Sequence, residues 1–212
     1  MFDNDNIIKV IKIGVLGDST VGKSILCNTV LNYIFKEEIL ITGCVERLET
    51  KYCLSNGKDI KLLLFDTPGV YNFRSSSIKG VKSVQGIVLV FDVTKKSTFN
   101  SLNGWLNDIK ENLNNPCLVL FGNKIDIDKE KWEVTTEEAK NFAKSKNLPY
   151  FETSSKTKQG LNEGISYIVN ETYKSVLEKL NTKIELGEHA DEKSKCVGKN
   201  NKNSKGKQKK KK

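Results

Sequence analysis

The sequence predicts an α/β fold in which a six-stranded, mostly parallel sheet carries helices on both faces. Apolar strand-like segments alternate with helix-like segments along most of the 212 residues, which is typical of parallel strands joined by crossover helices. An Asn56-Gly57 turn separates two neighbouring strand-like segments, and Asn-Gly is a strong hairpin signal. One strand is therefore expected to run antiparallel to the others, at an edge of the sheet.

The expected elements follow in order along the chain. Strands are predicted near residues 8–16, 45–54, 59–66, 86–92, 117–122 and 149–153. Helices are predicted near 22–34, 97–113, 135–146 and 161–181, with a mobile, partly helical segment at 70–85. One domain is expected over residues 8–181, with an N-terminal extension at 1–7 and a tail at 182–212. In a fold of this class, ligand-binding loops lie at the carboxyl ends of the strands.

The first connection from strand to helix has the sequence of a phosphate-binding loop. Residues 17–24 read Gly-Asp-Ser-Thr-Val-Gly-Lys-Ser, which is a Gly-x4-Gly-Lys-Ser pattern. Its backbone N–H groups are expected to surround phosphate oxygens, and the helix N-terminus adds a favourable partial charge. Lys23 should reach the outer phosphates, and the Ser24 hydroxyl should bind Mg²⁺. The predicted phosphate contacts are Gly17, Asp18, Ser19, Thr20, Val21, Gly22, Lys23, Ser24 and Ile25.

An Asn-Lys-x-Asp sequence after a later apolar strand indicates which base is bound. The carboxylate of Asp126 can accept hydrogen bonds from the N1–H and 2-amino groups of guanine. Adenine lacks this pair of donors, so it would leave a charged acceptor unsatisfied. Lys124 offers an aliphatic stem to cover the base, and Asn123 can tie neighbouring loops together.

A third motif, Asp-Thr-Pro-Gly, follows the apolar strand that ends near residue 66. Asp66 is positioned to hold Mg²⁺, and the backbone N–H of Gly69 could approach a terminal phosphate. The same four residues also favour an ordinary turn.

Together these motifs resemble the Ras superfamily of small GTPases, and most closely its Rab branch. Segments 86–94 and 97–106 are similar to a Rab strand and the helix after it, and 151–156 to the last guanine loop. The resemblance covers residues 8–180 and implies a three-layer P-loop NTPase fold, the small G domain, with GTP or GDP and Mg²⁺ as ligands. It also implies a magnesium role for Thr42, eighteen residues after Ser24, and base contacts from Phe35, Ser154, Ser155 and Lys156.

The sequence departs from the Rab pattern in the two expected switch segments. Residues 43–47 read Gly-Cys-Val-Glu-Arg where Rab proteins carry Ile-Gly-Val-Asp-Phe. Val70 stands where the family carries the glutamine that orients the attacking water. The catalytic positions are therefore Lys23, Gly69 and Val70, and we expect slow unassisted hydrolysis, which an activating protein that supplies its own glutamine could accelerate.

The resemblance implies a GTP/GDP-regulated switch in vesicle and membrane trafficking. Exchange factors, activating proteins and effectors are expected to contact residues 36–47 and 69–85 of a monomer. Two alternatives stay open. One is a GTP-binding module with little or no hydrolysis, and the other is an Era-like or septin-like GTPase, suggested by Asp-Thr-Pro-Gly. The spacing from Ser24 to Thr42 and the match at 86–106 argue against the second alternative.

The net charge of +9 belongs to the C-terminal end of the chain. Residues 193–212 contain ten lysines and no acidic residue, which leaves 25 basic and 26 acidic residues elsewhere. The domain is therefore not expected to bind nucleic acid. The tail is expected to be disordered, either as a solvated segment or as a contact for anionic membranes. Cys196 fits no C-terminal prenylation pattern, so a cytoplasmic protein, peripheral on intracellular membranes at most, is expected.

Overall fold

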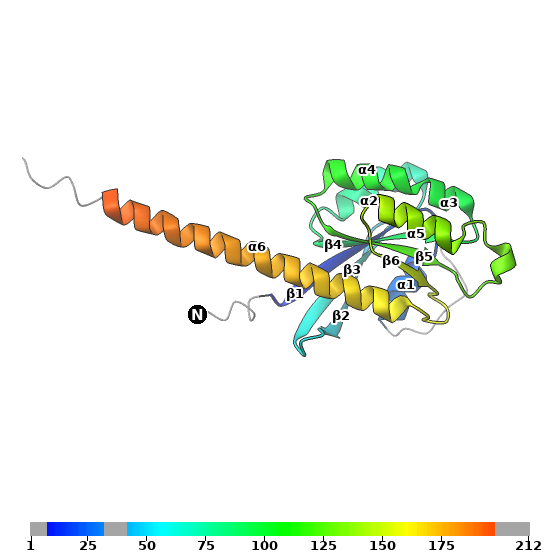
Figure 1. Cartoon of the computed structure of the whole chain (residues 1–212), viewed down its shortest axis with the longest axis horizontal. Coiled ribbons are helices and arrows are strands. Elements are labelled where there is room, and N and C mark those ends of the chain that lie inside the picture. Colours follow the sequence, from blue (N-terminus) through cyan, green and yellow to red (C-terminus); the bar gives the residue numbers. More distant parts are fainter. Residues whose placement is uncertain (1–7, 32–41, 198–212) are drawn as a thin grey trace, which may run out of the picture.

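The computed structural model describes residues 8–31 and 42–197, with side chains described up to residue 182. Figure 1 shows one sheet with helices on both faces and a long C-terminal helix that extends past it. Phe35 lies outside the described residues, as do the predicted N-terminal extension and residues 198–212.

The sheet has six strands in the order β2-β3-β1-β4-β5-β6. The edge strand β2 runs antiparallel to β3, and all other neighbouring strands are parallel. This arrangement confirms the predicted fold class. The strands are β1 (Val10–Leu16), β2 (Glu46–Cys53), β3 (Asp59–Asp66), β4 (Gly86–Asp92), β5 (Cys117–Asn123) and β6 (Tyr150–Thr153).

The helices lie close to the predicted positions, with two differences before residue 113. The helix predicted at 97–113 is two helices that meet at Ser101, and α1 ends at Val30 rather than at residue 34. The helices are α1 (Lys23–Val30), α2 (Arg74–Gly80), α3 (Lys96–Asn100), α4 (Leu102–Asn112), α5 (Thr136–Ser145) and α6 (Leu161–Val197), with short 3₁₀ helices η2 (Tyr71–Phe73) and η3 (Lys129–Lys131).

The predicted end of the last helix at residue 181 is wrong. Helix α6 continues to Val197, so the part of the chain expected to be a disordered tail begins inside a helix. Residues 182–197 contain no proline, and Lys, Glu, Leu and Ala, which favour helices, make up much of this stretch. The low hydrophobicity of the stretch expected to be disordered therefore did not prevent residues 182–197 from forming a helix. No helix in the described ranges is both long enough and apolar enough to cross a membrane.

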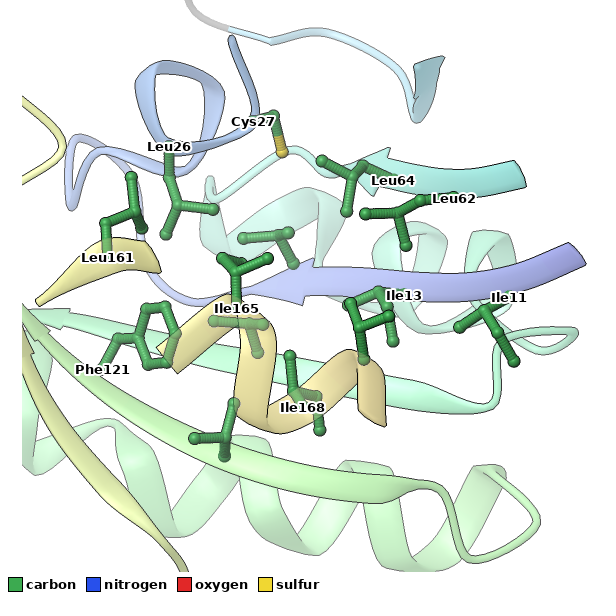
Figure 2. Close-up of a cluster of buried hydrophobic side chains, with 14 of the residues drawn as sticks. Ile11, Ile13, Leu26, Cys27, Leu62, Leu64, Phe121, Leu161, Ile165 and Ile168 are labelled. Atoms are coloured by element: carbon green, nitrogen blue, oxygen red, sulfur yellow. The ribbon is translucent and has the colours of Figure 1, made fainter. Parts of the chain in front are cut away.

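Two apolar clusters, one on each face of the sheet, hold the layers together. Because side chains alternate along a strand, β4 sends Val88 and Val90 into one cluster and Ile87, Leu89 and Phe91 into the other. Figure 2 shows the cluster on the α1 and α6 face, where side chains of both helices meet those of the sheet. Each fully buried Leu, Ile or Phe stabilises the fold by about 1.5 to 3 kcal/mol, so the strand ends are held firmly in place.

Candidate functional site

The carboxyl ends of five strands bring the predicted motifs to one edge of the sheet. The phosphate loop connects the end of β1 to the first residue of α1. The sheet register pairs Asp66 with Val15 of β1, and it pairs Asn123 with both Asp92 and Thr153. Loops far apart in the sequence are thus neighbours in space, as expected for the ligand edge of an α/β fold.

The phosphate loop requires glycine at two positions. Gly17 and Gly22 have φ angles of 142° and 101°, which side-chain-bearing residues rarely adopt. An added Cβ would lie 2.2 Å from the carbonyl oxygen of Val90 at Gly17, and 2.4 Å from Asn123 Nδ2 at Gly22. The loop is therefore packed tightly against β4 and β5.

Lys23 is a buried cation at the start of α1. Its side chain is 6% exposed, and Nζ donates a hydrogen bond to the carbonyl oxygen of Asp18 at 2.7 Å. Burial lowers the pKa of Lys23 to about 8, against the opposing effects of the Asp66 and Asp18 carboxylates. Phosphate oxygens beside Nζ would favour the charged form, so this pocket suits an anionic ligand.

The three predicted magnesium ligands contribute oxygen atoms to one place. Ser24 Oγ lies 3.0 Å from Thr42 Oγ1, although the two residues are eighteen positions apart. The side chain of Asp66 is buried, and its Oδ1 has no hydrogen-bond partner among the described residues. Burial raises the pKa of Asp66, while Ser24 and the Lys23 charge oppose this change.

These oxygens fit Mg²⁺. Hydroxyl and carboxylate oxygens are the hard ligands that this ion prefers, and it keeps several further positions for water and phosphate. A cation would also satisfy the orphaned carboxylate oxygen of Asp66, which is otherwise costly to bury. No group of three His, Cys, Asp or Glu side chains suited to a metal occurs in the described part of the chain.

Gly69 and Val70, two of the predicted catalytic positions, lie beside the phosphate loop. A Cβ at Gly69 would lie 2.4 Å from both the Asp18 carbonyl oxygen and Lys23 Nζ, so the two loops are in close contact. Val70 follows and, with Ser19 and Thr20, lines a groove of about 560 Å³ that extends to α4. The side chain of Val70 has no hydrogen-bonding group, so nothing at this position can orient a water.

Asn123 joins three loops of the site. Its Nδ2 donates to the carbonyl oxygen of Val21 at 2.8 Å, inside the phosphate loop. Its Oδ1 accepts from the backbone N–H of Ser155 at 3.1 Å and from the Ser155 hydroxyl at 3.2 Å. Ser155 is therefore part of this network.

The remaining predicted base contacts lie around the same loops. Asp126 is exposed, and its Oδ1 accepts a hydrogen bond from Ser154 Oγ at 2.6 Å. The ammonium of Lys124 lies 2.6 Å from Asp92 Oδ2. Lys156 is exposed in the loop after β6, and Ile25 is half-buried in α1.

Sequence reasoning assigned no role to Asp92 or to Trp105, which both contact predicted site residues. Asp92 ends a buried strand as Asp66 does, and this parallel could have identified it. The Trp105 indole N–H donates to Asp18 Oδ1 at 2.8 Å, and the Arg74 guanidinium lies 4.4 Å from the Trp105 ring. The sequence around Trp105 predicts a helix, but it does not indicate that the indole contacts the phosphate loop.

Comparison with known proteins identifies the family of the chain. The Ras family model matches residues 12–174. The Ras-related protein Rab-18-B of Danio rerio is 35% identical over 160 residues, which cover 74% of this chain and 77% of that protein. The chain therefore belongs to the Ras family, and it is a Rab-like small GTPase of the GTP-binding switch type.

Proposed function

We propose that this chain binds GTP and GDP with Mg²⁺, hydrolyses GTP slowly without assistance, and acts in intracellular membrane trafficking. The observation that carries the proposal is the Asn123 network, which joins the phosphate loop to both candidate guanine loops. The spacing between a triphosphate site and a base site is thereby set by buried hydrogen bonds.

Each part of the site has a separate role in the proposal. Lys23 neutralises charge on the outer phosphates, and Ser24, Thr42 and Asp66 hold Mg²⁺. When bound, Mg²⁺ supplies positive charge that stabilises the phosphoryl group during transfer. Asp126 accepts hydrogen bonds from the guanine edge. These assignments are supported by the buried cation, the orphaned carboxylate oxygen and the exposed acceptor described above.

Slow hydrolysis is proposed because of Val70. Orienting the attacking water by a glutamine is part of the catalytic machinery of related GTPases, and valine cannot do it. The groove beside Val70 is open to a side chain supplied by an activating protein. Regulators and effectors are proposed to contact residues 36–47 and 69–85, where Tyr71 is 82% exposed and Phe73 is 44% exposed.

The lysine-rich segment at 193–212 is proposed to bring the protein to anionic membranes. Each lysine near such a surface contributes about 1 kcal/mol, so several together can hold a protein that is otherwise in the cytoplasm. Sedimentation with phosphatidylserine vesicles tests this, using the full chain and a version without residues 190–212. Salt-sensitive binding of the full chain alone is expected, and equal binding of both would contradict it.

Isothermal titration with GDP, GTP and ATP in the presence of Mg²⁺ tests base selection. Guanosine nucleotides should bind far more tightly than ATP, because ATP leaves Asp126 without donors. Comparable affinity for ATP would contradict the role of Asp126.

Single-turnover hydrolysis tests the catalytic proposal against the alternative of a binding module. The wild-type chain should hydrolyse bound GTP slowly, and Val70→Gln should accelerate the reaction by about a hundredfold or more, since a positioned catalytic group contributes on this order. No hydrolysis by the wild type would favour the GTP-binding module. Unchanged hydrolysis by Val70→Gln would show that the deficit lies elsewhere.

A further inference from the structure

Asp92 is a fully buried carboxylate at the end of β4, and it lies outside the predicted site. Its side chain is 1% exposed. A carboxylate removed from water is strongly destabilising unless its oxygens are paired or hydrogen-bonded. The groups that contact Asp92 therefore indicate its role.

The two oxygens of Asp92 have different partners. Oδ1 accepts from the backbone N–H of Thr94 at 2.9 Å and from the Thr94 hydroxyl at 2.7 Å, which caps the turn after β4. Oδ2 has no hydrogen-bond donor among the described residues and faces the Lys124 ammonium at 2.6 Å. One oxygen thus stabilises the turn, and the other oxygen interacts with the positive charge of Lys124.

Lys124 is constrained at both ends. Its backbone has a φ angle of 71°, in the left-handed region that side-chain-bearing residues adopt only when the surroundings impose it. Its side chain is 28% exposed, and its ammonium is anchored on Asp92. The aliphatic stem between these points is therefore held in the loop that leads to Asp126.

We infer that Asp92 is a positioning residue for the base: it holds the Lys124 side chain in the orientation that covers guanine. The inference rests on the proposed function, because Lys124 covers a base only if the chain binds one. Asp92 does not touch the nucleotide. Its effect should be the same for GDP and GTP, because the two nucleotides share the base.

A double-mutant cycle with Asp92→Asn and Lys124→Met tests this positioning role. Asparagine keeps the acceptor for Thr94 and removes the charge that Lys124 needs. We expect Asp92→Asn to release a fluorescent GDP analogue roughly 10 to 100 times faster, as for a weakened interaction with a charged group. The ratio of GTP to GDP affinity should not change. In a chain that carries Lys124→Met, adding Asp92→Asn should not accelerate release of the GDP analogue any further.

Thermal unfolding in the absence of nucleotide gives an independent readout. Lys124→Met alone leaves a buried carboxylate without its cation and should lower the melting temperature. Adding Asp92→Asn removes that charge, so the double variant should be more stable than Lys124→Met. This comparison remains informative if Asp92→Asn alone does not fold, and it does not require the chain to bind guanine.

Asp59→Asn is the matched control. Asp59 forms an ion pair with Lys51, is 52% exposed and lies on the hairpin between β2 and β3, so nucleotide release should not change. Equal acceleration by Asp92→Asn with and without Lys124, or no acceleration at all, would overturn the positioning role. A double variant no more stable than Lys124→Met would also overturn it. Failure of the wild type to bind guanosine nucleotides would instead refute the proposed function.

Discussion

One residue of the closely packed phosphate loop has a strained backbone conformation. Thr20 has a φ angle of 65°, in the left-handed region, where a β-branched residue is a clear outlier. Its hydroxyl accepts a hydrogen bond from Lys95 Nζ at 3.3 Å, on an exposed part of the loop. The loop that carries this strained residue is packed closely against Val90, Asn123 and Gly69.

Thr20→Gly should stabilise the nucleotide-free protein. Glycine adopts a positive φ without steric cost, so a gain of about 1 kcal/mol is expected, slightly reduced by loss of the exposed contact with Lys95. Urea unfolding measures it, with Thr20→Ala as the control that keeps a Cβ atom. Lower stability of Thr20→Gly than of the wild type would contradict the strain at this position.

Lys23 should make stability depend on pH in a defined range. Below pH 8 the side chain is protonated in both the folded and the unfolded chain, so the cost of burying its charge is fully present. Between its folded pKa of about 8 and its ordinary value of 10.5, the unfolded chain binds more protons, and stability rises with pH. The full change is roughly 3 kcal/mol.

The measurement for Lys23 is the difference in unfolding free energy between the wild type and Lys23→Met. This difference cancels the contributions of other titrating groups, including Tyr150, whose pKa is raised by burial. We expect the unfolding free energy of the wild type to increase relative to that of Lys23→Met as the pH rises from about 7.5 to 9.5. A difference independent of pH would mean that the Lys23 ammonium is not desolvated.

Among the elements, the strand ends and the loops after them act as one unit. Asn123 connects β5 to the phosphate loop and to the loop after β6. The Trp105 indole of α4 connects to Asp18 of the phosphate loop, and Arg74 at the start of α2 lies over that indole. The candidate switch helix α2 is therefore linked through α4 to the loop that is expected to bind phosphate.

Asn123→Ala should remove the hydrogen bonds that connect these elements and destabilise the protein. It removes a donor to the Val21 carbonyl and an acceptor for the Ser155 backbone N–H, both of which are buried. Each buried polar group left unsatisfied costs about 1 to 3 kcal/mol, so a total loss of roughly 2 to 6 kcal/mol is expected. Chemical denaturation without nucleotide measures it, and Asn103→Ala, at an exposed site on α4, is the control. Equal stability of both variants would show that Asn123 acts only through the ligand.

The whole molecule consists of a packed domain and a helix that continues beyond it. Helix α6 contributes buried residues from Leu161 to Tyr173, and partly buried Val176, Leu177 and Leu180 pack against the same cluster. Figure 1 shows the helix running on past the sheet. We therefore propose that the domain is complete near residue 181, as the sequence predicted, although the helix is not.

Removal of residues 183–212 should leave the domain intact. The melting temperature and the affinity for GDP should not change, since the packing side chains remain. Removal of residues 174–212 takes away Val176, Leu177 and Leu180 and should cost about 2 to 5 kcal/mol, as partial loss of apolar packing does. Circular dichroism during heating compares the two deletions. Destabilisation by the shorter deletion would mean that the distal part of α6 supports the domain.

The sequence by itself determined the fold class and the positions of the ligand loops. Strand-helix alternation, the Asn56-Gly57 turn and the glycines of residues 17–24 are local patterns, and each imposes its geometry over a few neighbouring residues. The motifs that follow β1, β3 and β5 had to meet, because parallel strands place their carboxyl ends at one edge.

Only the tertiary structure decided which side chains touch across that edge. The pairing of Asp92 with Lys124 and the hydrogen bond from Trp105 to Asp18 join residues 32 and 87 positions apart. Such contacts depend on strand order, register and helix rotation, which no local pattern encodes. The same holds for the end of α6, whose backbone continues as a helix to Val197, well beyond the packed residue Leu180.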